Sequence, residues 1–381
     1  MSKHVLYIYA FLINFDVYSI IPGLPLSYGK ATLFIFVIFF LIEKNLNAKF
    51  SIDRFQLLIL LGMSGANLAM LFSGILATDT VQLNFRLFQN IFLVFLIIET
   101  ISSSRELDKL MLYFIFGSIF QSLLVLMGYG IGGDELRLLI FNDNPNTTAL
   151  RFSLASALLL YSISKSTITK LKKLFFVTLV LLLGYMIIQT ASRSGVITYL
   201  AVIIIFLFRP QEWNRSSILT IFLFLSVSSY AIYRLIIEDA SIILRMSNSI
   251  EKGDLAGRED IWGWLMGLIK ERPIFGIGIE GYHTQSVLHY GKYISPHNAV
   301  LELLVKGGIV SLLFFSFSLV KVLKNIIKSW LKKNPFTASL TIILIVIIST
   351  AQFLTMKIGW FVLSIILIQL KHEKYSISHT K

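Results

Sequence analysis

The chain has 381 residues, of which 56% are hydrophobic and only 14% are charged. A soluble globular domain carries roughly 25% charged residues, so this composition excludes an ordinary soluble fold. There is no cysteine, which excludes disulfide bonds, thiolate metal sites and cysteine nucleophiles. The formal net charge is +13, and the positions of the basic residues decide what that charge means.

Apolar residues occur in long blocks with few charges. Blocks of about 20 such residues are typical of transmembrane helices, because backbone groups in lipid must be hydrogen-bonded within the segment. The sequence therefore predicts an all-α polytopic membrane protein, with residues 1–381 forming a single integral membrane domain of about twelve transmembrane helices. The predicted spans are 5–21, 26–42, 55–77, 83–101, 110–131, 147–164, 174–191, 195–208, 217–237, 298–320, 337–354 and 358–370.

Basic residues gather in the loops on one side of this predicted membrane. Lysines and arginines follow the second, sixth and tenth spans and fill the C-terminal tail, at 44–54, 165–173, 321–333 and 371–381. The positive-inside rule places these loops, and both termini, in the cytoplasm. This distribution accounts for the net charge, so nucleic-acid binding is not predicted.

The opposite face carries one long loop, residues 238–297, and long ordered loops are usually functional. Within it, residues 259–271 are predicted to form a short helix, because acidic residues open the segment and basic residues close it. Pro273 ends that helix. Trp262 and Trp264 favour the headgroup level, so we expect the helix to lie at the membrane surface.

The segment GIGIEG, residues 276–281, matches the dinucleotide-binding pattern of glycines. That pattern needs a preceding strand, a following helix and a cytosolic setting, and none is predicted here. The segment is interpreted as a tight turn whose glycines allow positive φ. Its backbone N–H groups could alternatively approach a phosphate.

Four arginines are expected on the outer face: Arg137, Arg151, Arg193 and Arg258. Arg193 lies in the turn TASRSG beside hydrocarbon, where a charge is costly and marks a candidate functional residue. Snorkelling to lipid headgroups is the alternative. Arg258 precedes the predicted interfacial helix, and contact with lipid phosphate is its alternative. Arg137 and Arg151 flank NDNPN, where Asn146 is expected to cap the next helix.

His297 directly precedes Asn298, the expected N-terminus of the 298–320 span. Histidine can exchange a proton near neutral pH, although a surface histidine beside a helix cap is the alternative. The spacing of His283, His289 and His297 matches no zinc pattern, so no metal is predicted. Glu302 and Lys306, four residues apart, are interpreted as an ion pair that solubilises the first turns.

Taken together, these pieces resemble the signature of the O-antigen polymerase and O-antigen ligase superfamily. In order, the matching pieces are Asn-Pro-Asn at 144–146, SRSG at 192–195, Arg258 to Trp262, Pro273 to Gly278, His297-Asn298 and Gly307 to Ile309. The resemblance implies a glycosyltransferase of the bacterial inner membrane with its active site facing the periplasm. Its donor would be an undecaprenyl-pyrophosphate-linked oligosaccharide, with no nucleotide sugar, cofactor or metal.

The resemblance also implies roles for particular residues. Arg193 and Arg258 would stabilise the departing pyrophosphate, because fixed cations aimed at developing negative charge lower the barrier and guanidinium binds phosphate as a fork. His297 would activate or orient the acceptor hydroxyl. The candidates for substrate binding are Arg137, Arg151, Asn146, Asn298 and Trp262.

The first interpretation is a polymerase of lipid-linked repeat units, and the alternative within the same class is the ligase that moves finished polymer onto lipid A–core. A chain-length regulator and membrane lipid are the other expected partners. A flippase or secondary carrier is the alternative from another class, and it predicts ionisable residues at mid-membrane. Asp16 is the only acid well inside a predicted span, which argues against transport.

Overall fold

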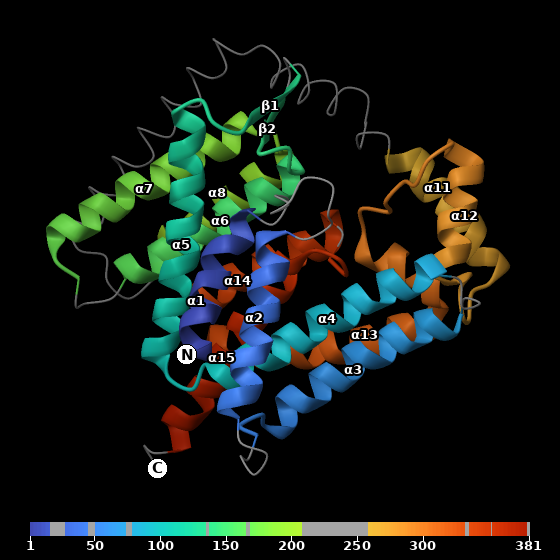
Figure 1. Cartoon of the computed structure of the whole chain (residues 1–381), viewed down its shortest axis with the longest axis horizontal. Helices are drawn as coiled ribbons and strands as arrows, with labels where there is room; N and C mark the ends of the chain where they lie inside the picture. Colours follow the sequence, from blue (N-terminus) through green and yellow to red (C-terminus); the bar gives the residue numbers. More distant parts are fainter. Residues whose placement is uncertain are drawn as a thin grey trace. The chain divides into compact units, whose positions relative to one another are not determined.

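The computed structural model describes residues 1–15, 27–44, 50–73, 78–134, 137–164, 168–207, 258–331, 335–351 and 353–378. Within these ranges the chain forms thirteen α-helices, one 3₁₀ turn and one two-stranded hairpin (Figure 1). The residues cluster into two compact units, each assembled from three separate stretches of the chain. Unit 1 comprises residues 1–45, 105–253 and 330–343, and unit 2 comprises residues 46–104, 254–329 and 344–381. That the whole chain is a single domain stays a prediction.

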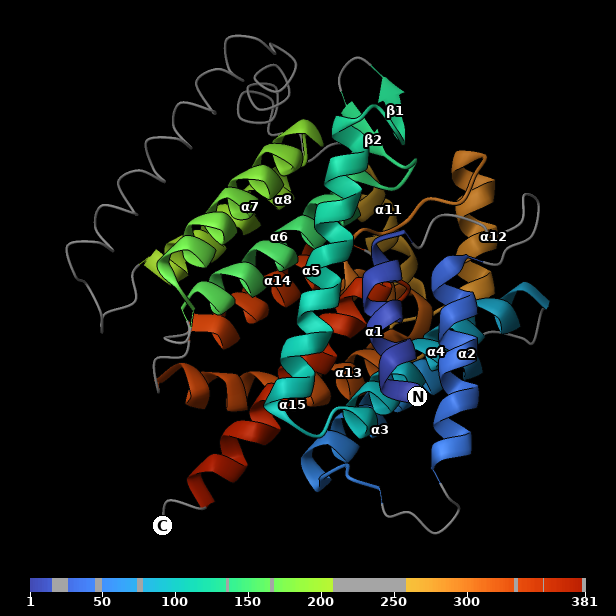
Figure 2. The same cartoon turned by 60° about the vertical axis from the view of Figure 1, so that its left-hand side comes forward.

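Unit 1 is organised around α6, whose side chains from Ala149 to Leu159 are all buried. This helix packs against α7 and α8, which lie beside it in Figure 2. Asn144 caps α6 through a hydrogen bond from the Asn146 N–H, and Pro145 occupies its first position, where the missing donor costs nothing. The helices of unit 1 are α1 (Ser2–Leu12), α2 (Tyr28–Glu43), α5 (Ser104–Leu126), α6 (Pro145–Ile163), α7 (Lys170–Gln189) and α8 (Arg193–Leu207), with a 3₁₀ turn at Ile13–Phe15.

A short antiparallel hairpin in unit 1 departs from the predicted all-α fold. Strand β1 (Ile131–Asp134) pairs with β2 (Arg137–Ile140), so that Ile131 lies opposite Ile140. The sequence analysis treated this stretch as a loop between two spans. The hairpin is local, and the fold remains almost wholly helical.

Unit 2 contains helices joined by hydrogen bonds from polar side chains to carbonyl groups of neighbouring helices. Ser318 Oγ donates to the Ile59 carbonyl at 3.0 Å, and Ser311 Oγ donates to the Ala66 carbonyl at 2.8 Å. Such bonds are typical of helix contacts in a membrane. The helices are α3 (Arg54–Phe72), α4 (Thr78–Thr100), α11 (Arg258–Glu271), α12 (Gly278–Tyr290), α13 (Ala299–Leu331) and α15 (Lys357–Ser378). Helix α14 (Pro335–Thr350) has residues in both units.

The predicted spans agree with this helix list, except that 217–237 lies outside the described residues. Each of the other predicted spans overlaps a helix, although residues 16–21 of the first span and 74–77 of the third also lie outside the described residues. Among the described residues, four helices are long and apolar enough to cross a membrane: Arg54–Phe72, Ser104–Leu126, Lys170–Gln189 and Ala299–Ile327. Shorter apolar helices are Leu87–Thr100, Arg193–Leu207 and Pro335–Thr350. A mostly helical membrane protein is therefore confirmed in outline, and the number twelve stays a prediction.

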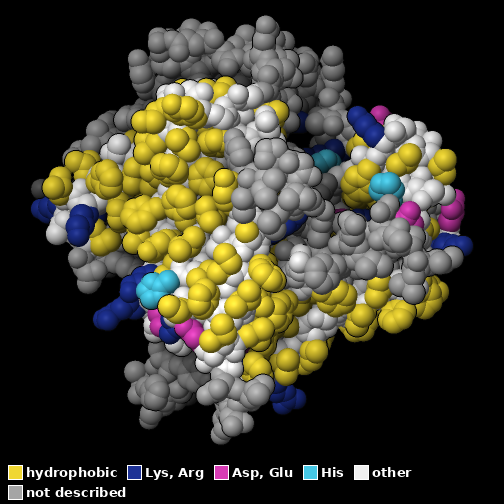
Figure 3. Space-filling view, viewed as in Figure 1, with side chains coloured by type: hydrophobic (Ala, Val, Ile, Leu, Met, Phe, Trp, Pro, Cys, Tyr) yellow, Lys and Arg dark blue, Asp and Glu magenta, His cyan; other side chains and the backbone are white. Residues whose placement is uncertain are grey.

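Large apolar side chains cover the outer faces of these helices. Phe116 of α5 is 51% exposed in unit 1, and Leu61 of α3 is 57% exposed in unit 2. Figure 3 shows broad hydrophobic areas over both helices. Soluble monomers rarely expose contiguous apolar surfaces of this kind, which agrees with helices that face lipid.

The described part of the long loop is a helical hairpin packed on the start of α13. Helix α11 confirms the predicted helix at 259–271, whereas α12 was not predicted. The core of the hairpin consists of Leu265, Leu268, Ile269, Tyr282 and Val305. Both loop tryptophans pack against this core, and the place of the helix at the membrane surface stays a prediction.

Candidate functional site

His297 lies on the loop that joins α12 to α13, residues 291–298, which we call the histidine loop. Asn298 caps α13 as expected: its Oδ1 accepts hydrogen bonds from the Val300 and Leu301 N–H groups at 2.9 and 3.1 Å. His297, directly before the cap, is half-buried and has a φ of +50°. Non-glycine residues in this left-handed region cost energy and cluster at functional sites. This backbone strain marks His297 as a candidate functional residue.

Trp262 joins α11 to the loop that carries His297. Its indole N–H donates to the Pro296 carbonyl at 3.0 Å, immediately before His297 in the chain. Arg258, the first residue of α11, lies one turn before Trp262 and therefore shares a face with it. The spacing from Arg258 to Trp262 thus brings a guanidinium toward the histidine loop while the tryptophan holds that loop in place.

The electrostatic setting of His297 favours the neutral form of its ring. Burial, followed by the nearby positive charge of Arg258, lowers the pKa of His297 from its usual value, while the carboxylate of Glu302 acts in the opposite direction. A neutral imidazole can accept a proton. Among the described residues nothing forms a hydrogen bond with the His297 ring.

Helix α12 holds the rest of the histidine loop. The Tyr282 hydroxyl donates to the Ile294 carbonyl at 2.5 Å. Ser286 Oγ donates to the Lys292 carbonyl at 3.1 Å and accepts from the Ile294 N–H at 2.8 Å. Burial raises the pKa of Tyr282 above its usual value, so the phenol stays protonated and keeps donating. Sequence analysis missed these two scaffold residues because no local pattern marks them.

The glycine-rich turn after α11 packs against a kink in α13. The Ile309 N–H donates to the Pro273 carbonyl at 2.9 Å, and the Ile277 N–H donates to the Val305 carbonyl at 2.9 Å. At the kink, Gly308 has a φ of +64°, and a Cβ there would lie 2.1 Å from the Ile274 carbonyl oxygen. Only glycine fits that approach.

Two expectations for GIGIEG change as a result. The turn has positive φ at Gly276 and Gly278, as predicted, but a helix follows it, contrary to the expectation. The N–H groups of Gly276 and Ile277 bond the carbonyls of Arg272 and Val305. Because these two N–H groups already donate within the protein, they are not free to bind a phosphate.

In unit 1 the SRSG and Asn-Pro-Asn segments contact each other. Ser192 Oγ donates to Asn146 Oδ1 at 2.7 Å and caps α8 by accepting from the Gly195 N–H at 3.2 Å. Arg193 follows as the first residue of α8 and is half-buried. The expected capping role of Asn146 is wrong, because Asn144 caps α6 and Asn146 instead accepts the bond from Ser192.

Arg151 is buried, with 3% of its surface exposed. It donates to the Asn14 carbonyl at 2.7 Å and forms an ion pair with Asp143. These contacts give it a structural role in unit 1, and its contact with substrate stays a prediction. Arg137 lies in strand β2 opposite Asp134, and its predicted substrate role also stays a prediction.

The remaining histidines of the loop have aromatic partners. His289 stacks on Trp264 at 5.2 Å between ring centroids, and His283 stacks on Tyr293 at 5.6 Å. Within the described ranges, no three His, Cys, Asp or Glu side chains come together as a metal site would require. His297 therefore differs from the other two histidines in having no aromatic ring stacked on it among these residues.

Glu302 and Lys306 contradict the expectation of a solubilising pair. They are 3% and 2% exposed, and Lys306 Nζ lies 2.5 Å from Glu302 Oε1. The helical spacing predicted the pairing but not the burial, because burial depends on α11 and α12 covering this face of α13.

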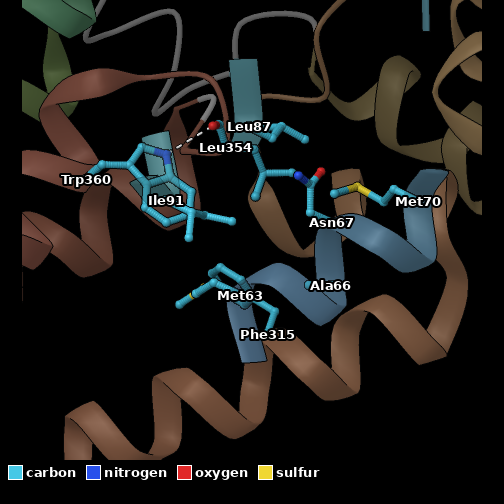
Figure 4. A pocket seen from close by; sticks show the side chains of 9 residues that line it. All are labelled: Met63, Ala66, Asn67, Met70, Leu87, Ile91, Phe315, Leu354 and Trp360. Carbon is cyan, nitrogen blue, oxygen red and sulfur yellow. Dashed lines mark hydrogen bonds between the residues drawn. The ribbon is translucent and has the colours of Figure 1, made fainter. Parts of the chain in front are cut away.

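Unit 2 also encloses a small apolar cavity between α3, α4 and α13 (Figure 4). It is about large enough for one water molecule. Asn67 lines it with 2% of its surface exposed, and neither atom of its amide has a hydrogen-bond partner among the described residues. Trp360, also in the lining, donates to the Leu354 carbonyl at 3.0 Å.

Comparison with known families identifies one match. Residues 178–316 match a family model described as O-antigen ligase. The matched segment includes Arg193, Arg258 and His297, whereas Arg137, Asn146 and Arg151 precede it. No curated protein matches the chain. The match confirms the resemblance to the O-antigen polymerase and ligase superfamily, a class of glycosyl-transfer enzymes that act on lipid-linked polysaccharide in a membrane.

Proposed function

We propose that this chain polymerises undecaprenyl-pyrophosphate-linked repeat units into O-antigen or a related surface polysaccharide. The observation that carries the proposal is the hydrogen bond from Trp262 to the Pro296 carbonyl. It fastens the helix that begins at Arg258 to the loop that presents His297, so a cation and a neutral base belong to one rigid element. The family match and the apolar helices support the same reading.

The proposed reaction gives each of these groups a role. The acceptor hydroxyl oxygen bonds to the anomeric carbon of the donor, and its proton passes to the neutral imidazole of His297. The bond from that carbon to the phosphate oxygen breaks, and its electron pair leaves with the lipid diphosphate. Arg258 stabilises the charge that develops there.

The placement of these groups in the cell is part of the proposal. Arg258 and His297 belong to unit 2, and we propose that they act on the periplasmic side of a bacterial inner membrane. Arg193 belongs to unit 1, and its role in binding diphosphate is a separate proposal that rests on the family resemblance. Both termini would then be cytoplasmic. Asn146, Asn298 and Trp262 each make a hydrogen bond within the protein, so we propose that they hold the site in shape.

The test is polymer synthesis by the purified full-length chain, supplied with lipid-linked repeat units and read as a ladder on a gel. His297→Ala should lower the rate by about 100-fold or more, because general-base catalysis contributes at least that much. His283→Ala and His289→Ala are matched controls from the same loop and should retain most of the activity. Equal losses in all three variants would remove the base role from His297.

The ligase is the second candidate, because the matching family model, described as O-antigen ligase, does not distinguish it from the polymerase. It uses the same donor chemistry and differs in the acceptor, lipid A–core. A deletion strain separates the two. Loss of a polymerase leaves core carrying a single repeat, whereas loss of a ligase leaves bare core with polymer stranded on its lipid carrier. A chain-length regulator is a proposed partner of the polymerase alone. Transport gains no support from the match.

A further inference from the structure

The Glu302–Lys306 ion pair is buried beneath the histidine loop. The two side chains are 3% and 2% exposed, and their charged atoms lie 2.5 Å apart. Removing two charges from water is costly, and an ion pair in such a place contributes little to stability compared with apolar side chains of similar volume. A stability role therefore does not explain why the pair is there.

The lysine end of the pair is tied to the loop through two tyrosines. The Lys306 ammonium lies 5.3 Å from the centre of the Tyr282 ring, and its positive charge acts on the phenol of Tyr293. Tyr282 in turn bonds the Ile294 carbonyl. The charge of Lys306 is thereby balanced by Glu302. Its contact with Tyr282 links it to the histidine loop, which leads to His297.

The glutamate end of the pair acts on His297 itself. Glu302 lies one turn after the capping residue Asn298, and its backbone N–H bonds the Asn298 carbonyl. Two charged groups influence the His297 ring: Arg258 from α11 and Glu302 from α13. Glu302 is held at the start of α13 by its ion pair with Lys306. Burial and Arg258 hold the pKa of His297 down, and Glu302 opposes them.

We propose that Glu302 is a positioning residue for His297, whose carboxylate, held in place by Lys306, stabilises the imidazolium that forms when His297 takes the proton of the acceptor hydroxyl. The inference rests on the proposed function of His297. It extends that function by giving the base a negative partner that offsets Arg258. Without Glu302, burial and Arg258 would act on the ring unopposed, and the protonated ring would be harder to form.

The sign of the pH effect follows from these charges. A base must be neutral to act, so the rate rises as pH increases through the pKa of His297. Replacing Glu302 by glutamine removes the group that raises this pKa. The acidic limb of the pH–rate profile should therefore move to lower pH, even though the maximal rate falls. A purely structural defect would lower the rate at every pH and leave the midpoint of the limb in place.

The experiment compares pH–rate profiles of purified full-length variants on lipid-linked repeat units, from about pH 5 to 9. Glu302→Gln should lower the maximal rate about tenfold and move the acidic midpoint down by about half a pH unit. Because this variant leaves Lys306 buried without its partner, the double variant Glu302→Gln/Lys306→Met is measured as well and should show the same displacement. Glu271→Gln, at the exposed end of α11, is the matched control and should keep the wild-type profile.

Two outcomes would overturn the inference, and they differ in what else they remove. If His297→Ala is inactive and the folded double variant keeps the wild-type acidic midpoint, Glu302 has no electrostatic role and the proposed function stands. If His297→Ala retains wild-type activity, the base role of His297 fails and the role of Glu302 fails with it.

Discussion

The first turns of α6 and α13 are built alike. Each helix starts at an asparagine whose side chain bonds backbone N–H groups, Asn144 in α6 and Asn298 in α13. Each carries a buried cation two turns further on, Arg151 or Lys306, and each cation is paired with a carboxylate. The two helices belong to different compact units, so the same local arrangement occurs twice in the chain.

The difference lies in the residue just before each cap. In α6 that residue is Asp143, whose carboxylate forms an ion pair with Arg151. In α13 the partner of the cation is Glu302, inside the helix, which leaves the position before the cap to His297. Its ring is half-buried and forms no hydrogen bond with the described residues around it. In α13 both members of the ion pair lie within the helix, so the residue before the cap, His297, is left to take the proposed catalytic role. In α6 the residue before the cap is itself a member of the ion pair and has a structural role.

The largest effects should come from removing one arginine on each side of this comparison. Arg151→Met leaves Asp143 without its partner in a position only 11% exposed, so it should destabilise the protein by about 3 kcal/mol or more. We expect a lower Tm in detergent and poor yield. Arg258→Met should keep the wild-type Tm and lower polymer synthesis by about 100-fold. The reverse pattern, with Arg258 needed for folding and Arg151 for activity alone, would break the comparison.

A smaller effect is expected at the hydrogen bond that holds the histidine loop. Trp262→Phe keeps the ring packing but removes the donor to Pro296, at a cost of about 1 kcal/mol in stability. Because a small displacement of a catalytic base is costly to the rate, synthesis should fall about tenfold. Trp264→Phe is the matched control from the same helix, since Trp264 contacts the rings of Tyr282 and His289, and it should retain most of the activity. Equal losses would show that packing, not the bond, matters.

The smallest effect should come from the cavity between α3, α4 and α13. Asn67→Leu replaces an amide without a hydrogen-bond partner among the described residues, so we expect the Tm to stay level or rise, by less than about 1 kcal/mol in stability. Asn90→Leu is the control, because its amide donates to the Leu354 carbonyl at 3.1 Å and its loss should lower the Tm. A clear fall for Asn67→Leu would contradict the expectation that its amide contributes nothing to stability.

Much of the local structure could be predicted from the chain alone. Apolar blocks marked the helices because a membrane imposes their length and composition. The charge pattern from Glu259 to Arg272 and the proline at 273 predicted α11 to within a residue, because helix termini depend on nearby side chains. Asn298 was recognised as a cap for the same reason, while Asn144 was missed in favour of Asn146, two residues away.

The sequence by itself determined which segments are helical, where several of them stop, and which residue types form the family signature. Only the tertiary structure decided that Trp262 bonds the loop before His297, that Glu302 and Lys306 are buried, and that the turn after α11 needs the glycine kink of α13. Helix termini follow from side chains within a few residues of each other. These contacts join residues that lie far apart along the chain, and their burial depends on how α11 and α12 fold back onto α13, which no local pattern encodes.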